Sequence, residues 1–553
     1  MNKQPVPPLH AACRTSLLLF SASAAFAASA GAAWAQAIPA GQIDPAALQR
    51  QEQERRQLEP APVAAAADAP TVRQQDQPDA APAPVVGSAR FILRELSFGP
   101  STFLATANLK AIADPYTGKE VDFATLSRIV DAVNALYRKQ GVLTGRAVLP
   151  PQKVSDGKVR IDLVEARLGQ VDLSGNRYSR PGYITGLMTG AQGETIDTQD
   201  LSDRIGRFNR AGGVQLEANL HPGASFGLTD LMLSVREPAR YQARVFANNE
   251  GSQNIGREQV GIDAAVNGLA GLGDRLGVYA TRARGATLGS ASYALPVNRW
   301  GGHLSASYNV GSTDVIAGPF RALGISGISR SVQLGAVQPV WQRGAWYLDL
   351  AGTIGRTRSD NAVNDTPLSD TTIRNQSLGA TFAGSTDQRR ISLSGTLTHA
   401  RANALAAQER SFNVRQWNAS WVENTGANQF ALLRLSAQDT SAALLAPALL
   451  FQLGGSASVR GYEVGVLSGD RGFLANFEWH RAMGAGATGF LFFDAGQVRT
   501  RGLPNQVVRS AGFGVNAQWG RAINANLTAG RTLETITPGQ HGWRVTGRVS
   551  YEL

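Results

Sequence analysis

The sequence predicts an exported protein whose C-terminal part, residues 241–553, is a transmembrane antiparallel β-barrel of about 16 strands. Two small βααββ domains and a tethered N-terminal helix are predicted to precede this barrel. Three observations lead to this fold class. They are an apolar export signal, two consecutive segments that combine one amphipathic helix with short strands, and a long region in which apolar and polar residues alternate.

The composition is typical of a β-rich protein with few charged side chains rather than of an ordinary soluble protein. The chain has 553 residues, of which 60 are glycine, and only 17% are charged, whereas about 25% is usual. The basic residues behind the net charge of +11 do not cluster, since the last lysine is Lys158 and the later arginines are scattered. We therefore predict no nucleic-acid partner. A helical membrane protein needs about 20 consecutive apolar residues. The best apolar run after the N-terminus, residues 442–451, is shorter and contains Pro447.

The N-terminus has the pattern of a secretory signal peptide. Basic residues precede an apolar, alanine-rich stretch at residues 17–33, and a small-x-small sequence ends at Ala35, directly before Gln36. We therefore predict a signal peptide over residues 1–35 that is cleaved between Ala35 and Gln36. The one cysteine, Cys13, lies within it, so the mature chain is predicted to contain no disulfide.

A polar helix and a linker follow the signal peptide. Asp44 can cap a helix, Pro45 suits its first position, and no helix breaker occurs before Leu58. Because this helix is rich in Gln, Glu and Arg and has almost no apolar stripe, it should lie in water or in a polar cavity. Residues 59–88 are largely Pro, Ala, Gln and Asp, which is typical of a flexible linker. We expect residues 36–58 to be a movable plug helix on this tether.

Residues 89–166 predict a compact α/β domain, and residues 167–240 repeat its scheme. The main helix of the first domain should be capped by Asp122 and end at Gly141. Its apolar face consists of Leu126, Ile129, Val130, Val133, Leu136 and Tyr137. The helix of the second domain presents Leu201, Ile205 and Phe208 and should end at Gly212. The simplest description is two βααββ domains in tandem.

Residues 241–553 have the alternation that is typical of membrane β-strands. The last segment shows it best, with one face formed by Trp543, Val545, Gly547, Val549, Tyr551 and Leu553. In a barrel this face contacts lipid, while the charged and hydroxyl side chains between these residues face a watery lumen. About 20 residues per strand and loop give roughly 16 strands, which can enclose an aqueous channel. Periodicity alone leaves a soluble β-sandwich or β-helix open.

Several segments match one known family. Residues 137–141 (Tyr-Arg-Lys-Gln-Gly) and 149–152 (Leu-Pro-Pro-Gln) resemble the first POTRA (polypeptide-transport-associated) domain of the two-partner secretion (TpsB) outer-membrane transporters. These are the haemolysin or adhesin secretion and activation proteins. Residues 209–214 (Asn-Arg-Ala-Gly-Gly-Val) are similar to the second POTRA domain, and residues 271–276 resemble the first barrel hairpin of the family.

The most specific match is Val459-Arg460-Gly461-Tyr462. In the family this motif forms the tip of a long loop, here residues 454–472, which folds back into the barrel. A second motif, Phe492-x-Asp494-x-Gly496, lies on a later strand.

The resemblance implies that Asp494 binds Arg460 and anchors the loop tip. Alternation places Phe492, Asp494 and Gly496 on the lumen face, where the carboxylate can accept the guanidinium in fork geometry and Gly496 leaves room for the loop. From spacing alone, Arg460 and Asp494 could equally be two solvated channel residues.

Catalytic and cofactor signatures are not found in the sequence. The six histidines are far apart and lack the spacing of metal ligands. Gly484-x-Gly486-x-x-Gly489 matches a dinucleotide fingerprint but should be a hairpin turn, because strand-like alternation follows it. Gly223-x-Ser225-x-Gly227 matches a nucleophile elbow but should be a loop between two strands. We predict no enzyme activity, no cofactor and no metal.

The resemblance implies a transporter in the outer membrane of a Gram-negative bacterium, with its POTRA domains in the periplasm. Such a protein captures a large unfolded haemolysin- or adhesin-like exoprotein and secretes it through the barrel without nucleotide, as in type V secretion. Its other expected partners are outer-membrane lipid and the barrel-assembly machinery that inserts it. Two alternatives stay open, namely a barrel-assembly factor of the same superfamily and a passive porin-like channel.

Overall fold

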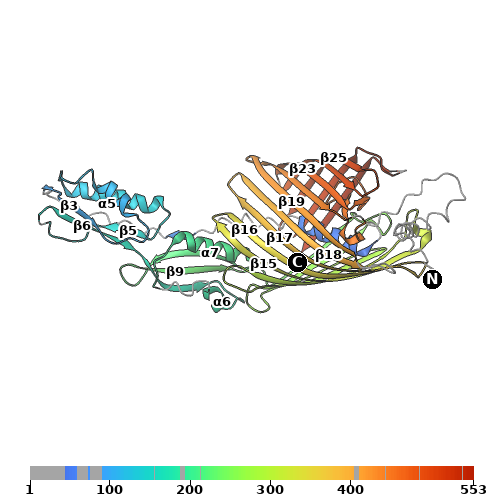
Figure 1. Ribbon diagram of the computed structural model, residues 1–553, viewed down its shortest axis with the longest axis horizontal. Helices are drawn as coiled ribbons and strands as arrows, with labels where there is room; N and C mark the ends of the chain where they lie inside the picture. The colour runs from blue at the N-terminus through green and yellow to red at the C-terminus, as the bar shows by residue number, and fades with distance from the viewer. Residues whose placement is uncertain are drawn as a thin grey trace, which may run out of the picture.

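The computed structural model describes residues 44–58, 72–74, 90–154, 156–186, 193–211, 213–403, 410–442, 444–484, 486–537 and 540–553. The predicted signal peptide with Ala35 and Gln36, and most of the predicted linker, lie outside these residues. Two small domains and a barrel follow one another along the long axis of the molecule (Figure 1). No helix among the described residues is long and apolar enough to span a membrane.

The first small domain has the predicted βααββ scheme. Its elements are β2 Phe91–Ile92, β3 Glu95–Phe98, α4 Thr106–Ala113, β4 Glu120–Val121, α5 Phe123–Lys139, β5 Gly145–Val148 and β6 Lys158–Glu165. The strands β3, β6 and β5 form the sheet, in which β3 is parallel and β5 antiparallel to β6. Helix α5 buries Leu126, Ile129, Val133 and Tyr137 in the core, as its apolar face predicts. Asp122 accepts a 2.8 Å hydrogen bond from the Thr125 backbone, and Gly141 follows the helix at a φ of 76°.

A half-buried carboxylate connects the first loop of this domain to its helix and sheet. Glu165 accepts hydrogen bonds from the backbone N–H groups of Thr102 (2.8 Å) and Phe103 (3.3 Å), and from the Ser101 hydroxyl. The Tyr137 hydroxyl also donates to Glu165, at 3.0 Å. Burial raises the pKa of Tyr137 to about 12. Burial alone would also raise the pKa of Glu165, but the hydrogen bonds from Ser101, Thr102 and Phe103 outweigh it and hold that pKa below its usual range.

Glu165→Ala is expected to destabilise the first domain by about 1–3 kcal/mol, because two backbone donors and a hydroxyl lose their acceptor. The measurement is amide hydrogen exchange of Thr102 and Phe103 in the whole protein, with Glu120→Ala, at an exposed position of β4, as the control. Since the Glu165 pKa is lower in the folded state, its stabilisation is present above the unfolded pKa of about 4.3 and is lost as pH falls through the folded pKa. Equal exchange in both variants at pH 7 would contradict this role.

The second small domain repeats the scheme and adds one strand. Its elements are β7 Arg167–Ser174, α6 Pro181–Thr185, α7 Thr198–Ala211, β8 Gln215–Pro222 and β9 Leu228–Arg236. Its core contains the predicted Leu201, Ile205 and Phe208 of α7. Strand β1, Val72–Gln74, comes from the predicted linker and pairs in parallel with β8. These three residues are therefore not free linker, because the edge of β8 offers unpaired N–H and C=O groups to an extended chain.

The C-terminal region forms a closed barrel of 16 antiparallel strands, as predicted. The strands are β10 Tyr241–Asn248, β11 Gln259–Asn267, β12 Arg275–Ala283, β13 Ala286–Pro296, β14 His303–Asp314, β15 Ile325–Arg343, β16 Trp346–Val363, β17 Thr366–Ser385, β18 Arg389–Asn403, β19 Arg410–Gly426, β20 Gln429–Thr440, β23 Arg471–Gly484, β24 Ala487–Arg499, β25 Gln506–Trp519, β26 Ile523–Thr532 and β27 Trp543–Glu552. The pairing of β10 with β27 closes the barrel. Of the two glycine motifs that resemble enzyme signatures, the one at residues 484–489 runs from the end of β23 into the start of β24, and the one at residues 223–227 lies between β8 and β9.

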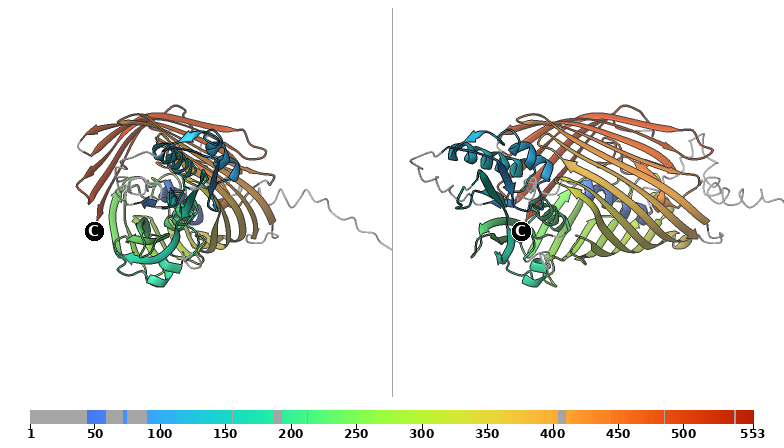
Figure 2. Two further views of the ribbon diagram at one scale, coloured as in Figure 1. Left: turned by 90° about the vertical axis from the view of Figure 1, so that its left-hand side faces the viewer. Right: turned by 60° about the vertical axis from the view of Figure 1, so that its left-hand side comes forward.

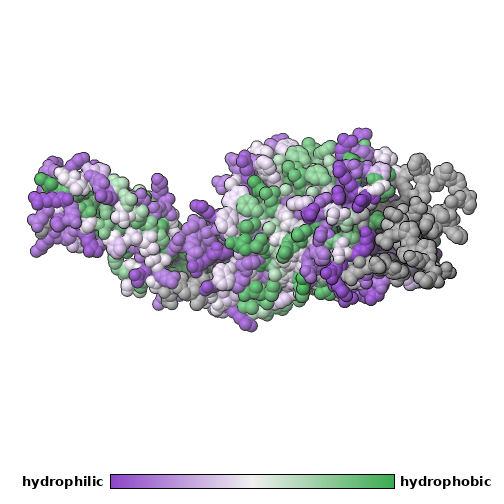
Figure 3. Space-filling model, viewed as in Figure 1, coloured by the Kyte–Doolittle hydropathy of each residue, from purple (hydrophilic) through white to green (hydrophobic). Residues whose placement is uncertain are grey.

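The outside of the barrel is an apolar band, which Figure 3 shows in green between hydrophilic ends. On β27 the exposed side chains are those of Trp543, Val545, Val549 and Tyr551, which is the face predicted to contact lipid. Other apolar side chains more than two-fifths exposed on this surface include Leu334, Ile354, Leu378, Leu397, Trp417, Leu491, Phe513 and Leu527. A soluble barrel would not expose so continuous an apolar surface.

The second domain lies directly on the barrel, at the end from which β10 starts. Arg210 of α7 forms a 3.4 Å ion pair with Asp349 of β16, and its guanidinium lies 3.9 Å from the ring centre of Tyr347. The ring of Tyr178 packs against Gly268, in the turn between β11 and β12. These contacts fix the second domain beside one mouth of the barrel, which the views of Figure 2 show from two sides.

Candidate functional site

The predicted polar helix lies inside the barrel. Helix α3, Pro45–Leu58, is the blue helix within the ring of strands in Figure 2. Asp44 caps it by accepting a 2.8 Å hydrogen bond from the Ala46 backbone, and the same carboxylate accepts hydrogen bonds from Ser359 and Asn361 of β16. At the other end, Arg56 lies 3.3 Å from Asp263 of β11. The helix therefore crosses the lumen from one side of the wall to another.

Hydrogen bonds rather than apolar packing hold the middle of this helix. Gln49 accepts a 3.1 Å hydrogen bond from Ser329 of β15, and Gln53 donates one of 3.0 Å to Asn309 of β14. The Tyr279 hydroxyl of β12 donates to Glu52. The composition of the helix indicates a polar cavity as its surroundings, and the lumen is such a cavity.

The lumen keeps a cavity of about 2100 Å³ beside α3. One wall of this cavity consists of short uncharged side chains of β17, β18 and β19, among them Ser377, Ser394, Thr396, Thr398, Asn418 and Ser420. Such a wall is hydrated and offers hydrogen bonds without strong charge. The barrel is therefore a water-accessible channel that α3 partly fills.

A second segment also enters the lumen, between β20 and β23. Its stem is the pair β21 Phe451–Leu453 and β22 Leu467–Gly469. Gly454 and Gly455, at φ values of 102° and 99°, turn the chain inward in a conformation that other residues rarely adopt. The predicted tip residues Val459, Arg460 and Tyr462 are all more than nine-tenths buried. We call residues 454–466 the inward loop.

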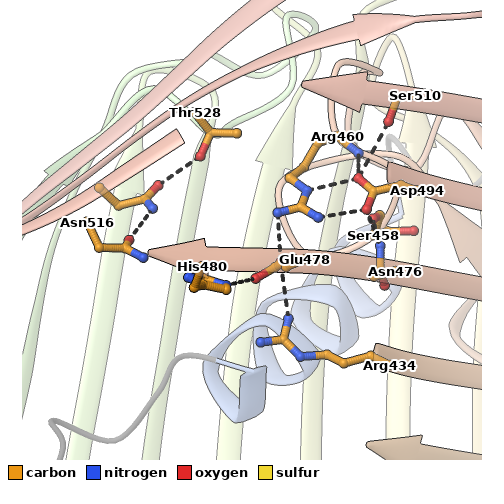
Figure 4. A network of polar contacts seen from close by, with 11 residues as sticks. Arg434, Ser458, Arg460, Asn476, Glu478, His480, Asp494, Ser510, Asn516 and Thr528 are labelled. Carbon is orange, nitrogen blue, oxygen red and sulfur yellow. Dashed lines mark hydrogen bonds and ion pairs between the residues drawn. The ribbon is translucent and has the colours of Figure 1, made fainter. Parts of the chain in front are cut away.

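The tip of the inward loop binds the wall strand β24 through Arg460 and Asp494. The guanidinium Nε and Nη2 atoms lie 2.8 and 2.7 Å from the two carboxylate oxygens of Asp494, and the Arg460 backbone N–H donates to the same group at 3.0 Å (Figure 4). Asp494 has no exposed surface. The guanidinium lies 3.8 Å from the ring centre of Phe492. This is the charge-assisted fork in which carboxylate and guanidinium bind most strongly.

The other motif residues lie where the loop meets the wall. A Cβ atom on Gly496 would lie 2.7 Å from Leu453 and 3.2 Å from Val459, so the close approach of the loop needs a glycine there. Gly461 packs on Gly530 of β26. The Tyr462 hydroxyl donates to the backbone oxygen of Glu534, at 2.9 Å. The structure thus brings both predicted motifs together.

Sequence reasoning missed a second acidic partner of Arg460. Glu478 on β23 accepts from the Nη1 atom of Arg460 at 2.7 Å and from His480 at 2.7 Å. Asn476 donates to Asp494 at 2.8 Å and to the loop backbone at Ser458. Alternation along residues 471–484 places Asn476, Glu478 and His480 on the lumen face, and this signal could have identified them.

The inward loop also connects the turn that follows β10 to the last strand, β27. Glu463 forms ion pairs of 2.7 Å with Arg257, which precedes β11, and of 2.6 Å with Arg544 on β27. Residues from both sides of the β10–β27 junction therefore bind one carboxylate. In the part of the chain that the structure describes, no three His, Cys, Asp or Glu side chains group as a metal site would require.

Two family models match this chain. The model described as haemolysin secretion/activation protein ShlB/FhaC/HecB matches residues 227–518, which is more than half of the 553 residues. The model of the ShlB-type POTRA domain matches residues 91–166, the first small domain. The barrel is therefore an outer-membrane barrel, and the small domains lie on its periplasmic side.

Similar proteins carry transporter names. The outer membrane transporter CdiB of Dickeya dadantii (strain 3937) is 23% identical over 476 residues, which cover 81% of this chain and 82% of that protein. The heme/hemopexin transporter protein HuxB of Haemophilus influenzae (strain 86-028NP) is 28% identical over 179 residues, and the match spans 31% of each protein. The structure of CdiB from Escherichia coli has a TM-score of 0.72 at 19% identity and covers 94% of this chain and 100% of that one, so it has the same fold. With a family model that matches most of its barrel and a POTRA model that matches its first domain, the chain belongs to the ShlB/FhaC/HecB family of haemolysin secretion/activation proteins.

Proposed function

We propose that the protein captures a large unfolded partner exoprotein in the periplasm and secretes it through the barrel. The observation that carries this proposal is the way the lumen is closed. Helix α3 fills part of a wide channel, and most of its contacts with the wall are side-chain hydrogen bonds and ion pairs. A helix bound in this way can leave the channel without unfolding the barrel.

The names of similar proteins support a transported polypeptide as the cargo. CdiB is named an outer membrane transporter and HuxB a heme/hemopexin transporter protein. By analogy, the partner of this chain is a haemolysin- or adhesin-like exoprotein that is exported without nucleotide. Folding of the exoprotein outside the cell buries its apolar residues and so makes its return through the pore unfavourable.

The POTRA domains are proposed to hold the exoprotein before export. An extended segment can bind to a sheet edge through backbone hydrogen bonds, and alternate side chains then select it. Strand β1 supports this mode, because it is an extended segment that pairs with the edge strand β8. This role needs no enzyme chemistry and no cofactor. The other partners in the proposal are outer-membrane lipid and, during biogenesis, the barrel-assembly machinery.

Removing residues 89–166, the first POTRA domain, is expected to abolish binding of the exoprotein while the barrel stays folded. The measurement is the affinity of the purified transporter for its partner exoprotein, together with heat-modifiable gel mobility as the test of the barrel. Glu120→Ala in the intact domain is the control and should bind normally. Retained binding after the deletion would confine recognition to the second domain.

Deleting the gene tests the proposed function as a whole. The exoprotein should then accumulate inside the cell instead of in the culture medium, while the amounts of other outer-membrane barrels stay constant. An exoprotein that still reaches the medium would contradict the transporter role. A general loss of outer-membrane barrels would indicate a barrel-assembly factor instead.

A further inference from the structure

An apolar segment covers part of the lumen at the extracellular end of the barrel. Residues 444–450 follow β20 and include the short helix η3, Pro447–Leu449. They belong to the apolar run 442–451 that the sequence singles out, and we call them the exit segment. Leu445 is only 6% exposed. The exit segment packs on the inner faces of β17, β18 and β19, where its contacts are Ile373, Ala400, Ala402, Phe412 and Val414.

A buried carboxylate holds the start of the exit segment. The backbone N–H groups of Leu444 and Leu445 donate to Asp470 at 3.1 and 2.8 Å, and Asp470 is only 2% exposed. Leu444 has a φ of 60°, a left-handed conformation that is rare for a bulky side chain. The segment is therefore held in a strained conformation by the bonds to Asp470, and losing them favours a different path of the chain.

The plug helix touches the same segment. Arg50 of α3 donates to the backbone oxygen of Ala448 at 3.1 Å and to the side-chain oxygen of Gln438 at 3.3 Å. Gln438 in turn donates to the backbone oxygens of Leu449 (2.8 Å) and Asp470 (3.1 Å). One charged side chain of the plug thus joins the network that fixes the exit segment. Arg50, Ala448 and Leu449 all line the 2100 Å³ cavity, so this network lies on the pore itself.

We propose that the exit segment is a second closure of the pore, which Arg50 keeps shut as long as α3 occupies the lumen. When α3 withdraws, Ala448 and Gln438 lose a charged donor, and the segment stays held by Asp470, by the bond from Gln438 to Leu449 and by its apolar contacts. The arriving polypeptide then lifts a short apolar segment from its contacts on β17–β19. The two closures open in order, the plug first and the exit second. This inference rests on the proposed function. It adds a coupling between the plug helix and the exit segment.

A buried alanine beneath the exit segment can report its opening. Ala400 on β18 has no exposed surface, and the one native cysteine, Cys13, lies in the predicted signal peptide. We would label Ala400→Cys with a membrane-impermeant maleimide on intact cells. Arg50→Ala and Asp470→Ala, each added to this reporter, should raise the labelling rate roughly tenfold, the change expected for the loss of a charged hydrogen bond. Arg50→Lys keeps a charged donor, so its labelling rate should stay closer to that of Ala400→Cys alone.

Two controls separate the exit segment from the plug. Leu444 is 49% exposed with the segment closed, so Leu444→Cys should label rapidly in every background. Arg358→Ala removes an exposed charge from β16 that pairs with Asp370 and has no bond to α3, so it should leave labelling of Ala400→Cys unchanged. Unchanged labelling in both Arg50→Ala and Asp470→Ala would overturn the second closure. An equal rise in Arg358→Ala and Arg50→Ala would overturn the coupling through Arg50. Labelling needs no exoprotein, so either failure is distinct from failure of the secretion assay.

Discussion

Arg460→Ala is expected to abolish secretion of the partner exoprotein while the barrel still reaches the outer membrane. Removing this side chain leaves the carboxylates of Asp494 and Glu478 buried without their main cation, which costs about 3–5 kcal/mol in comparable sites. The tip of the inward loop then loses its attachment to β24, whereas the ladder of strands stays intact. The measurements are immunoblots of the culture medium for the exoprotein and heat-modifiable mobility for the barrel.

The control removes the same charge from an exposed site. Arg415 on β19 forms a 3.2 Å ion pair with Asp439, and the two side chains are 56% and 41% exposed. Such a pair contributes about 0–1 kcal/mol, so Arg415→Ala should secrete normally. Asp494→Ala should behave like Arg460→Ala. Normal secretion in both of the buried-site variants would remove the role of this pair in anchoring the loop.

Removing residues 36–88 is expected to raise the single-channel conductance in planar bilayers severalfold. Helix α3 occupies the lumen of a 16-strand barrel, and barrels of this size leave an aqueous channel when they are not filled. The deletion also removes Arg50 and therefore its bond to the exit segment. Both effects widen the path for ions.

The structure calls for a second deletion, because the removed residues also include strand β1. Removing residues 36–58 alone takes out the plug and keeps the pairing of β1 with β8. The two deletions should give the same conductance if α3 is the plug. Unchanged conductance in both would show that α3 does not block the pore. An increase only with the longer deletion would assign the block to the linker instead.

Much of this architecture follows from local patterns. Alternation with a period of two predicts the strands and the faces of β24 and β27, and the capping rules predict Asp44 and Asp122. The resemblance of two motifs to a family predicts that Arg460 and Asp494 meet, whereas their spacing does not require it. The structure adds the geometry of the fork and its neighbour Glu478.

Other features depend on residues that are distant in sequence. Strand β1 is three residues of an otherwise linker-like composition, and it is a strand because β8 has a free edge beside it. Glu478 belongs to no motif, and only the register between β23 and β24 brings it to Arg460. In the sequence, the exit segment belongs to an apolar run that is too short to cross a membrane. Its packing partners lie on three strands, β17, β18 and β19, which the run itself does not indicate. Tertiary packing decides such contacts; a local pattern can place Glu478 on the lumen face, but it cannot name the partner that it meets there.

The ion pairs of Glu463 have a consequence for the time course of folding. Strands β10 and β27 are the first and last of the barrel, so their pairing must close the longest stretch of chain and should form last. Arg257 and Arg544 approach each other only when this pairing is complete. An unfinished barrel therefore cannot give Glu463 both of its cations, and the inward loop becomes fully secured only at the final step of assembly.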